Sequence, residues 1–89
     1  METETRASFI RDLKRLRSTT VRRRVERTIE TIEAAADITA IPGMVRITAT
    51  GEPHYRIRIG DYRLGIALDG DVVVLVRFLH RRDIYRFFP

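Results

Sequence analysis

The sequence lacks several residue types and patterns, and each absence excludes a class of protein. There is no cysteine among its 89 residues, so neither a disulfide framework nor a thiolate zinc site is possible. No apolar run approaches the roughly 20 residues that a membrane-spanning helix needs. The first residues, METETRASF, contain no apolar segment of the kind that a signal peptide carries. We therefore expect a single cytoplasmic domain over residues 1–89 with no membrane contact.

Common catalytic and ligand-binding motifs are also missing. The two histidines, His54 and His80, do not have the helical spacing of a metal-binding pair. The glycines at Gly60-Asp61 and Asp69-Gly70-Asp71 belong to turn sequences rather than to a glycine-rich phosphate loop. No serine lies in a nucleophile elbow. We expect neither a metal ion nor a small-molecule cofactor.

Positive charge, nearly all of it from arginine, is the most informative part of the composition. The chain has 17 basic and 12 acidic residues, a net charge of +5, and Lys14 is its only lysine. A basic surface favours nucleic acid, an anionic membrane or an acidic protein as partner. Arginine in particular favours bidentate contacts with phosphate and stacking on bases. A GC-rich genome is the competing explanation, chiefly for arginines on the helices.

Two helices and a short strand are expected in the first half of the chain. Helical spacing of apolar residues predicts the first helix near residues 9–16 and the second from about Val21 to Ala36. Ser18, Thr19 and Thr20 break the pattern and offer an N-cap for the second helix. Residues 44–47 fit a short strand. The second helix begins with a cluster of arginines that could extend a nucleic-acid surface: Arg22, Arg23, Arg24 and Arg27.

Residues 54–86 carry the strongest structural signal in the chain. Their alternation with period two predicts three strands. Gly60 and Asp61 supply a tight turn between the first two strands, and Asp69-Gly70-Asp71 supplies a three-residue turn before the third. The third strand, Val72 to Leu79, is apolar on both faces, which is typical of a central strand. We expect the chain to end, after this strand, in one short turn or an extended tail.

The predicted register gathers arginines on one face of this sheet. The loop at Gly60-Asp61 places Arg58 opposite Arg63, with Arg56 further along the same face. The three-residue turn would add Arg77 opposite Arg63. Like charges directly opposite each other on a sheet repel, so sheet stability alone does not favour this arrangement. The simplest explanation is an anion that these arginines hold together, and phosphate is the best match.

The same stretch resembles the RelE/ParE superfamily of bacterial and archaeal toxins. Three segments carry the resemblance: Tyr55-Arg56-Ile57-Arg58, Gly60-Asp61-Tyr62-Arg63 and His80-Arg81-Arg82-Asp83-Ile84-Tyr85-Arg86. The strings YRIRIGDYR and HRRDIYR are fairly specific at this separation, whereas either alone is weak. The resemblance implies an α+β fold, in which an N-terminal helical hairpin packs on a small, mainly antiparallel three- to four-stranded sheet. It also implies an edge strand within residues 2–5.

The resemblance further implies site residues. Arg56 and Arg58 match basic residues that line the RelE site, and Arg63 matches the arginine that contacts the scissile phosphate. Arg81 matches a basic residue beyond the last strand that acts as acid or electrostatic support. Tyr85 matches a late tyrosine that serves as base, although the spacing between Arg81 and Tyr85 is shorter here. Some relatives have a histidine near this point.

The residues themselves leave several roles open. A metal-independent ribonuclease needs a base for the 2′-OH, a cation for the transition state and an acid for the leaving oxygen. Histidine suits the first or third role, so His80 competes with Tyr85 as the base. Alternatively, His80 only caps a strand end, and Tyr85 packs in the core with the phenylalanines after it. Four catalytic candidates result, Arg63, Arg81, Tyr85 and His80, with five RNA-binding candidates: Arg56, Arg58, Arg77, Arg82 and Arg86.

The expected activity is that of a RelE-like toxin of a type II toxin–antitoxin system. The resemblance implies ribosome-dependent cleavage of mRNA in the A site. It implies three partners: the ribosome, mRNA, and an acidic antitoxin that folds on binding and covers Arg63 and Arg81. A ParE-like inhibitor of DNA gyrase without nuclease activity is the first alternative, because fold does not settle function. A non-catalytic nucleic-acid-binding domain is the second.

Overall fold

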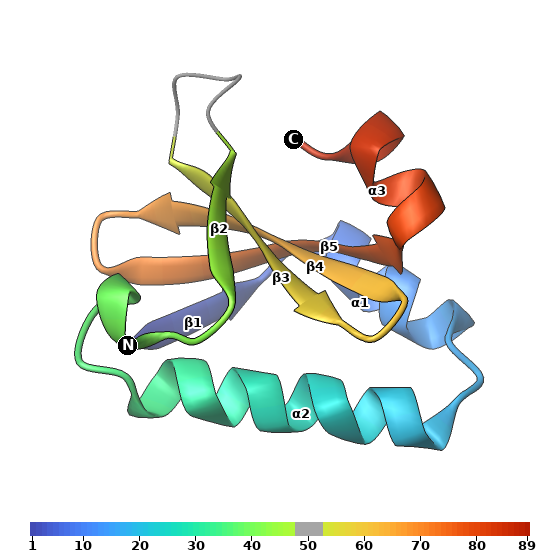
Figure 1. Cartoon of the computed structure of the whole chain (residues 1–89), viewed down its shortest axis with the longest axis horizontal. Coiled ribbons are helices and arrows are strands. Elements are labelled where there is room, and N and C mark those ends of the chain that lie inside the picture. Colours follow the sequence, from blue (N-terminus) through green and yellow to red (C-terminus); the bar gives the residue numbers. More distant parts are fainter. Residues whose placement is uncertain (48–52) are drawn as a thin grey trace.

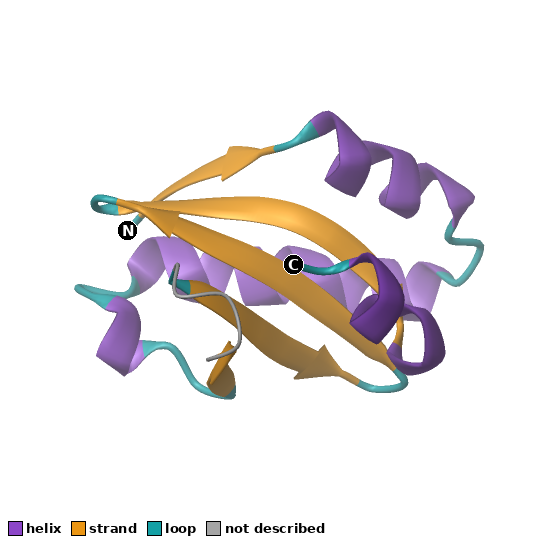
Figure 2. Cartoon of the chain, turned by 90° about the horizontal axis from the view of Figure 1, so that it is seen from above, coloured by secondary structure: helices purple, strands orange, loops and turns teal. Residues whose placement is uncertain are grey.

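The computed structural model describes residues 1–47 and 53–89 and forms a five-stranded sheet with helices on both faces (Figure 1, Figure 2). The strand order is β1-β5-β4-β3-β2, with β1 parallel to β5 and the other neighbours antiparallel. In chain order, the elements are β1 (Glu2–Thr5), α1 (Ala7–Arg15), α2 (Thr19–Ala34), the 3₁₀ helix η1 (Ile38–Ala40), β2 (Met44–Ile47), β3 (His54–Ile59), β4 (Tyr62–Asp69), β5 (Val72–His80) and α3 (Arg81–Phe87).

The predicted α+β class is confirmed, but the sheet has five strands rather than three or four. The additional pairing comes from β1, which has no apolar alternation and is held through its main chain beside β5. The N–H of Arg6 continues this pairing by donating to the carbonyl of Leu75 at 3.0 Å. Because β1 lies on one side of β5 and β4 on the other, β5 is an interior strand, as its apolar sequence predicted.

Helix α2 runs along one face of the sheet and closes the main core (Figure 1). Of the three residues that the sequence offered as N-cap, Ser18 has this role, since its hydroxyl accepts the N–H of Val21 at 3.2 Å, and the helix starts at Thr19 rather than Val21. The helix ends at Ala34, so the prediction that it continues to Ala36 was wrong. The side chains that α1, α2 and the sheet bury between them include Phe9, Val25, Ile32, Leu64, Ile66 and Leu75. No helix within residues 1–47 and 53–89 is long and apolar enough to cross a membrane.

The predicted register between β3 and β4 is confirmed, whereas the predicted register between β4 and β5 is wrong. Arg58 pairs with Arg63 across the Gly60-Asp61 turn. The second turn has two residues rather than three, because Gly70 adopts a φ of 57°, and Asp69 therefore pairs with Val72. A bulge at Gly65 then shifts the ladder again, so that Arg77 pairs with Gly65 and not with Arg63.

The chain ends in a helix, so the prediction of a single turn or an extended tail was wrong. Helix α3 lies over the face of the sheet opposite α2 (Figure 2). The N–H of Arg81 donates to the carbonyl of Asp61 at 2.8 Å, which ties the start of the helix to the β3–β4 turn. Ile84 and Phe88 are buried beneath it. Phe88 lies directly on Gly65, where an added Cβ would come within 2.7 Å of its ring.

Candidate functional site

A hollow of about 230 Å³ opens on the sheet face that α2 leaves uncovered. Its lining comes from four elements, namely β2, β3, β4 and α3: Val45, Arg56, Arg58, Arg63 and Tyr85. Strand alternation explains the arginines, because Ile57 and Ile59 of β3 point into the core and are buried. The residues between them therefore face the hollow.

The hollow is strongly electropositive. Three guanidinium groups line it, from Arg56, Arg58 and Arg63. Within residues 1–47 and 53–89, none of the three lies within 4 Å of a carboxylate, and the one ion pair joins Arg77 to Asp12. An anion therefore gains the full attraction of these groups. Among the described residues, those that line the hollow include no carboxylate or imidazole, and no cluster of three or more histidine or acidic side chains could hold a metal ion.

Arg63 is held in place by the turn that precedes it. Its Nη1 donates to the carbonyl of Gly60 at 3.0 Å and to that of Tyr62 at 2.9 Å. A guanidinium has five N–H donors, so these two contacts leave donors for a ligand. The two carbonyls also fix the side chain in one conformation beside Arg58, which reduces the entropy lost when an anion binds.

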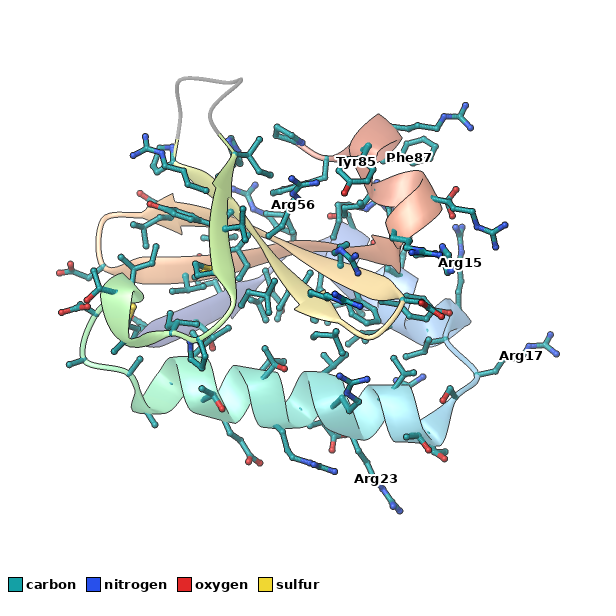
Figure 3. All side chains as sticks on the ribbon, viewed as in Figure 1. Arg15, Arg17, Arg23, Arg56, Tyr85 and Phe87 are labelled. Atoms are coloured by element: carbon teal, nitrogen blue, oxygen red, sulfur yellow. The ribbon has the colours of Figure 1, made fainter. Side chains whose placement is uncertain are left out.

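Tyr85 reaches the hollow from α3 and is 66% exposed. The interpretation of this residue as a core aromatic is therefore wrong, and Phe88 takes the buried position instead. The guanidinium of Arg56 lies 4.6 Å from the centre of the Tyr85 ring, a cation–π contact between β3 and α3 (Figure 3). This contact orients the phenol at the edge of the hollow.

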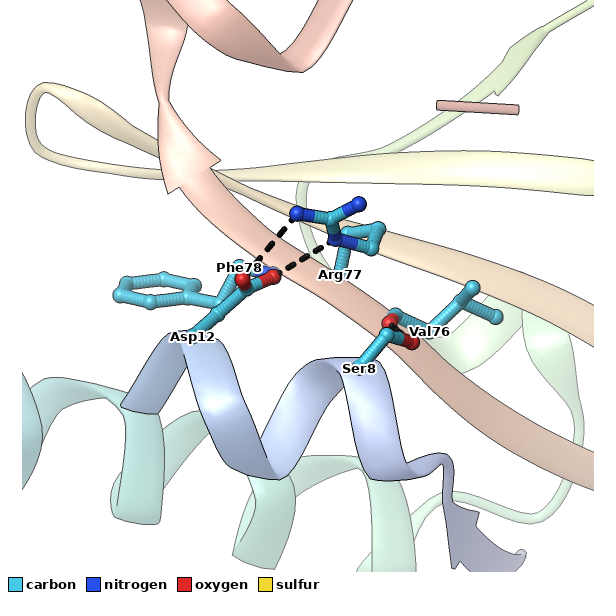
Figure 4. A network of polar contacts seen from close by, with 5 residues as sticks. All are labelled: Ser8, Asp12, Val76, Arg77 and Phe78. Atoms are coloured by element: carbon cyan, nitrogen blue, oxygen red, sulfur yellow. Dashed lines mark hydrogen bonds and ion pairs between the residues drawn. The ribbon is translucent and has the colours of Figure 1, made fainter. Parts of the chain in front are cut away.

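Arg77 lies on the same face of the sheet but does not line the hollow, which corrects the predicted cluster of four. Its Nε donates to Asp12 Oδ2 at 2.8 Å and its Nη2 to Oδ1 at 3.1 Å (Figure 4). Asp12, only 6% exposed, also accepts the N–H of Phe78 at 2.9 Å. Ser8 donates to the carbonyl of Val76 at 2.6 Å. Side chains of α1 thereby form hydrogen bonds with main-chain groups at the edge of β5, in the part of β5 that β1 does not pair with.

His80 lies outside the hollow. Its Nδ1 accepts the N–H of Arg82 at 3.2 Å and caps the start of α3, whereas the sequence suggested a cap at the strand end. It lines a different depression, together with Asp12, Tyr62 and Asp83. The three remaining arginines are exposed on α3: Arg81, Arg82 and Arg86. The structure thus brings four of the nine candidates together: Arg56, Arg58, Arg63 and Tyr85.

Two residues that matter for the hollow were missed by sequence reasoning. Val45 lines it because β2 places this residue opposite Arg56, and its 55% exposure marks a side chain outside the core. The predicted strand at residues 44–47 could have revealed this pairing. Gly65 allows Phe88 to pack on the sheet and so sets the height of α3 above it. No local sequence pattern shows that a glycine is needed there.

Known proteins share this fold and much of its sequence. The family model described as ParE toxin of type II toxin-antitoxin system, parDE, matches residues 4–85. Toxin RelE3 of Methanocaldococcus jannaschii is 33% identical over 82 residues, which cover 92% of each chain. A chain of the RelB-RelE antitoxin-toxin complex from Methanococcus jannaschii superposes with a TM-score of 0.79 at 32% identity, covering 96% of this chain and 98% of that one.

A more distant solved structure has the same architecture. The archaeal RelE-RelB complex from Pyrococcus horikoshii gives a TM-score of 0.72 at 19% identity, with 90% of this chain and 93% of that chain covered. At this identity the likeness shows the fold alone. The family model spans residues 4–85, which include the described residues that line the hollow, and the relative above 30% identity covers 92% of this chain. The chain therefore belongs to the RelE/ParE superfamily of toxins of toxin–antitoxin systems, as its motifs indicated.

Proposed function

We propose that the protein is a RelE-like toxin that cleaves mRNA in the ribosomal A site as a metal-independent endoribonuclease. The observation that carries this proposal is the hollow that three guanidinium groups and an exposed tyrosine line together. Its volume of about 230 Å³ is below the roughly 300–1,000 Å³ of pockets for drug-sized ligands. A phosphate with its sugar matches this size and charge.

The proposed reaction begins when the scissile phosphate enters the hollow. Tyr85, acting as its phenolate, takes up the proton of the ribose 2′-OH and becomes the neutral phenol, and the 2′-oxygen attacks phosphorus. Arg58 and Arg63 stabilise the additional negative charge on the phosphorane-like transition state. The bond from phosphorus to the 5′-oxygen breaks, and that oxygen takes up a proton from water, while Arg81 at the start of α3 supplies electrostatic support. The products are a 2′,3′-cyclic phosphate and a 5′-hydroxyl.

Tyr85 is preferred to His80 as the base because of its position. Tyr85 lines the hollow beside the arginines, whereas His80 lines a separate depression and uses Nδ1 to cap α3. A base must come within hydrogen-bond reach of the proton that it removes. The ribosome is proposed to orient the mRNA, so that the toxin itself supplies charge and proton transfer.

An antitoxin is the proposed protein partner. Structures similar to this chain include toxins in complexes described as RelB-RelE and RelE-RelB. A basic hollow with no carboxylate nearby in the described residues fits an acidic peptide that folds on binding. We propose that this peptide covers Arg63 and Arg81 and so keeps RNA out of the hollow.

The proposal is tested with programmed ribosomes. Primer extension after incubation with the protein should show cuts in the A-site codon, and Arg63→Ala should reduce the cleavage rate by at least about 100-fold, as loss of a transition-state charge contact does. Tyr85→Phe should have a comparable effect. Arg23→Ala is the matched control, because this exposed arginine lies on α2, away from the hollow (Figure 3). Equal cleavage by wild type and Arg63→Ala would refute the proposal.

A ParE-like activity is the second candidate, favoured by the description of the matching family model. It requires binding to DNA gyrase and no nuclease chemistry. Intact mRNA on programmed ribosomes, together with gyrase–DNA complexes trapped by the wild-type protein, would establish it. In that case Tyr85→Phe should leave growth arrest unchanged.

A further inference from the structure

A second exposed aromatic side chain on α3 has no place in the reaction described above. Phe87 is 52% exposed, although a phenylalanine on a short terminal helix could be buried as Phe88 is. Two guanidinium groups lie at 5.6 Å from the centre of its ring, those of Arg77 and Arg86. The cluster of Phe87, Arg77 and Arg86 is named here the stacking cluster.

Helix geometry separates the stacking cluster from the hollow while keeping the two close. Successive residues of an α-helix are turned by about 100°. With Ile84 and Phe88 buried against the sheet, Tyr85 and Phe87 lie on opposite flanks of α3 and Arg86 lies on its outer surface. The helix is about 10–12 Å across with its side chains. A short stretch of extended RNA therefore suffices to pass from the hollow, over Arg86, to Phe87.

The two arginines of the stacking cluster differ in how firmly their side chains are held. Two hydrogen bonds to Asp12 hold Arg77, so its guanidinium keeps one position beside the ring of Phe87. Arg86 is exposed, and no carboxylate among the described residues lies within 4 Å of it. Its guanidinium can therefore leave the ring of Phe87 and take up a phosphate while a base occupies the space beside the ring.

We propose that the stacking cluster is a nucleobase subsite, which holds a base of the single-stranded RNA next to the phosphate in the hollow. Phe87 supplies the stacking surface and Arg86 contacts the adjoining phosphate. Exposed aromatic rings combined with basic side chains are the usual platform for single-stranded nucleic acid. This inference rests on the proposed function in so far as the RNA strand is the one that is cut.

The charge around Phe87 favours RNA over an acidic protein as occupant. The ring is flanked by guanidinium planes, which stack on bases and bind phosphates bidentately. Arg81 and Arg82 lie in the first turn of α3, more than about 100° around its axis from Phe87, and Asp83 lies one turn before the ring. The cations that a chain with a regular negative charge meets at the ring are therefore Arg77 and Arg86. An antitoxin peptide on this cluster is the competing outcome of the test.

The test measures binding separately from cleavage. The probe is a single-stranded RNA that carries 2′-O-methyl groups, which prevent cleavage, and one 2-aminopurine base, whose fluorescence falls when it stacks. At low ionic strength, Phe87→Ala should weaken binding by about 5- to 150-fold, the range for loss of one base–aromatic stack, and should abolish the quenching. Phe87→Trp should retain both, whereas Phe87→Leu, which keeps an apolar side chain, should not.

Matched controls and a second ligand decide between the outcomes. Ile10→Ala removes an exposed apolar side chain from α1, and Arg17→Ala removes an exposed arginine; neither should alter binding or quenching. Binding and quenching that are equal in wild type and Phe87→Leu would overturn the inference. So would a Phe87→Ala variant that loses antitoxin binding but binds RNA normally.

Failure of the proposed function gives a different pattern. If the wild type does not cut mRNA on ribosomes but Phe87-dependent quenching is present, the nuclease is refuted and the nucleobase subsite stands. If the wild type and Arg63→Ala cut mRNA equally, the proposed roles fail independently of Phe87. If cutting depends on Arg63 but Phe87→Ala changes neither RNA affinity nor KM on programmed ribosomes, only the subsite is refuted.

Discussion

Arg58 and Arg63 lie directly opposite each other on β3 and β4 and share one hollow. A cross-strand pair of like charges is unfavourable, by an amount comparable to the roughly 0.2–1 kcal/mol that favourable pairs contribute. We therefore predict that Arg58→Ala leaves the free energy of unfolding unchanged or raises it by up to about 1 kcal/mol, while mRNA cleavage is lost. Urea denaturation measures the first quantity and primer extension the second.

The control for this prediction is Arg17→Ala, which removes an exposed arginine from the link between α1 and α2. It should change neither stability nor cleavage. If Arg58→Ala lowers the free energy of unfolding by more than about 1 kcal/mol, Arg58 stabilises the fold. A bound anion would then not be needed to explain why Arg58 lies opposite Arg63.

Asp12 should be more important to stability than the arginine that it binds. Asp12→Ala leaves the N–H of Phe78 without its acceptor and should cost about 1–3 kcal/mol. Arg77→Ala should cost less, because Asp12 keeps the bond to Phe78 and water can reach the freed carboxylate oxygen. Thermal unfolding of both variants provides the comparison. Equal losses would show that the ion pair, and not the backbone contact, holds α1 to β5.

Gly65 is predicted to determine where α3 lies. Gly65→Ala places a Cβ within 2.7 Å of the Phe88 ring, so the ring and the helix must move. We expect a loss of about 1–3 kcal/mol and reduced cleavage, because Tyr85 moves with α3. In a Phe88→Ala background the same substitution should be almost neutral. A double-mutant cycle in denaturant measures this coupling, and additive losses would contradict the proposed clash.

Asp37 provides a pH-dependent prediction away from the hollow. The hydroxyl and N–H of Thr39 donate to this carboxylate and hold its pKa below the usual range. A lowered pKa in the folded state means that the stabilisation is present above the unfolded pKa and is lost as pH falls through the folded pKa. In Thr39→Ala the pKa of Asp37 should rise, because one of its donors is removed. A carboxyl carbon NMR titration measures both variants, and an unchanged pKa would contradict this assignment.

Much of this structure follows from local patterns in the sequence. The alternation of Arg56, Ile57, Arg58 and Ile59 predicts which side chains of β3 face the core, and the Gly60-Asp61 turn predicts the pairing with β4. The polar residues 18–20 predict that α2 starts close to them. These predictions succeed because they depend on residues within one strand, turn or helix end.

The incorrect predictions concern contacts between distant parts of the chain. The bulge at Gly65, which moves Arg77 away from Arg63, cannot be read from the alternation in β5 alone. The pairing of Arg77 with Asp12 joins residues 65 positions apart. Likewise, α3 is stabilised by burial of Ile84 and Phe88 against the sheet rather than by its own short sequence.

The alternation of core-facing and hollow-facing residues along β3 determines which substitutions the fold tolerates. Ile57 and Ile59 hold the sheet to the main core, while the residues between them face the hollow and leave that core untouched. Substitutions at Arg56 or Arg58 can therefore alter the target of the protein at little cost to folding.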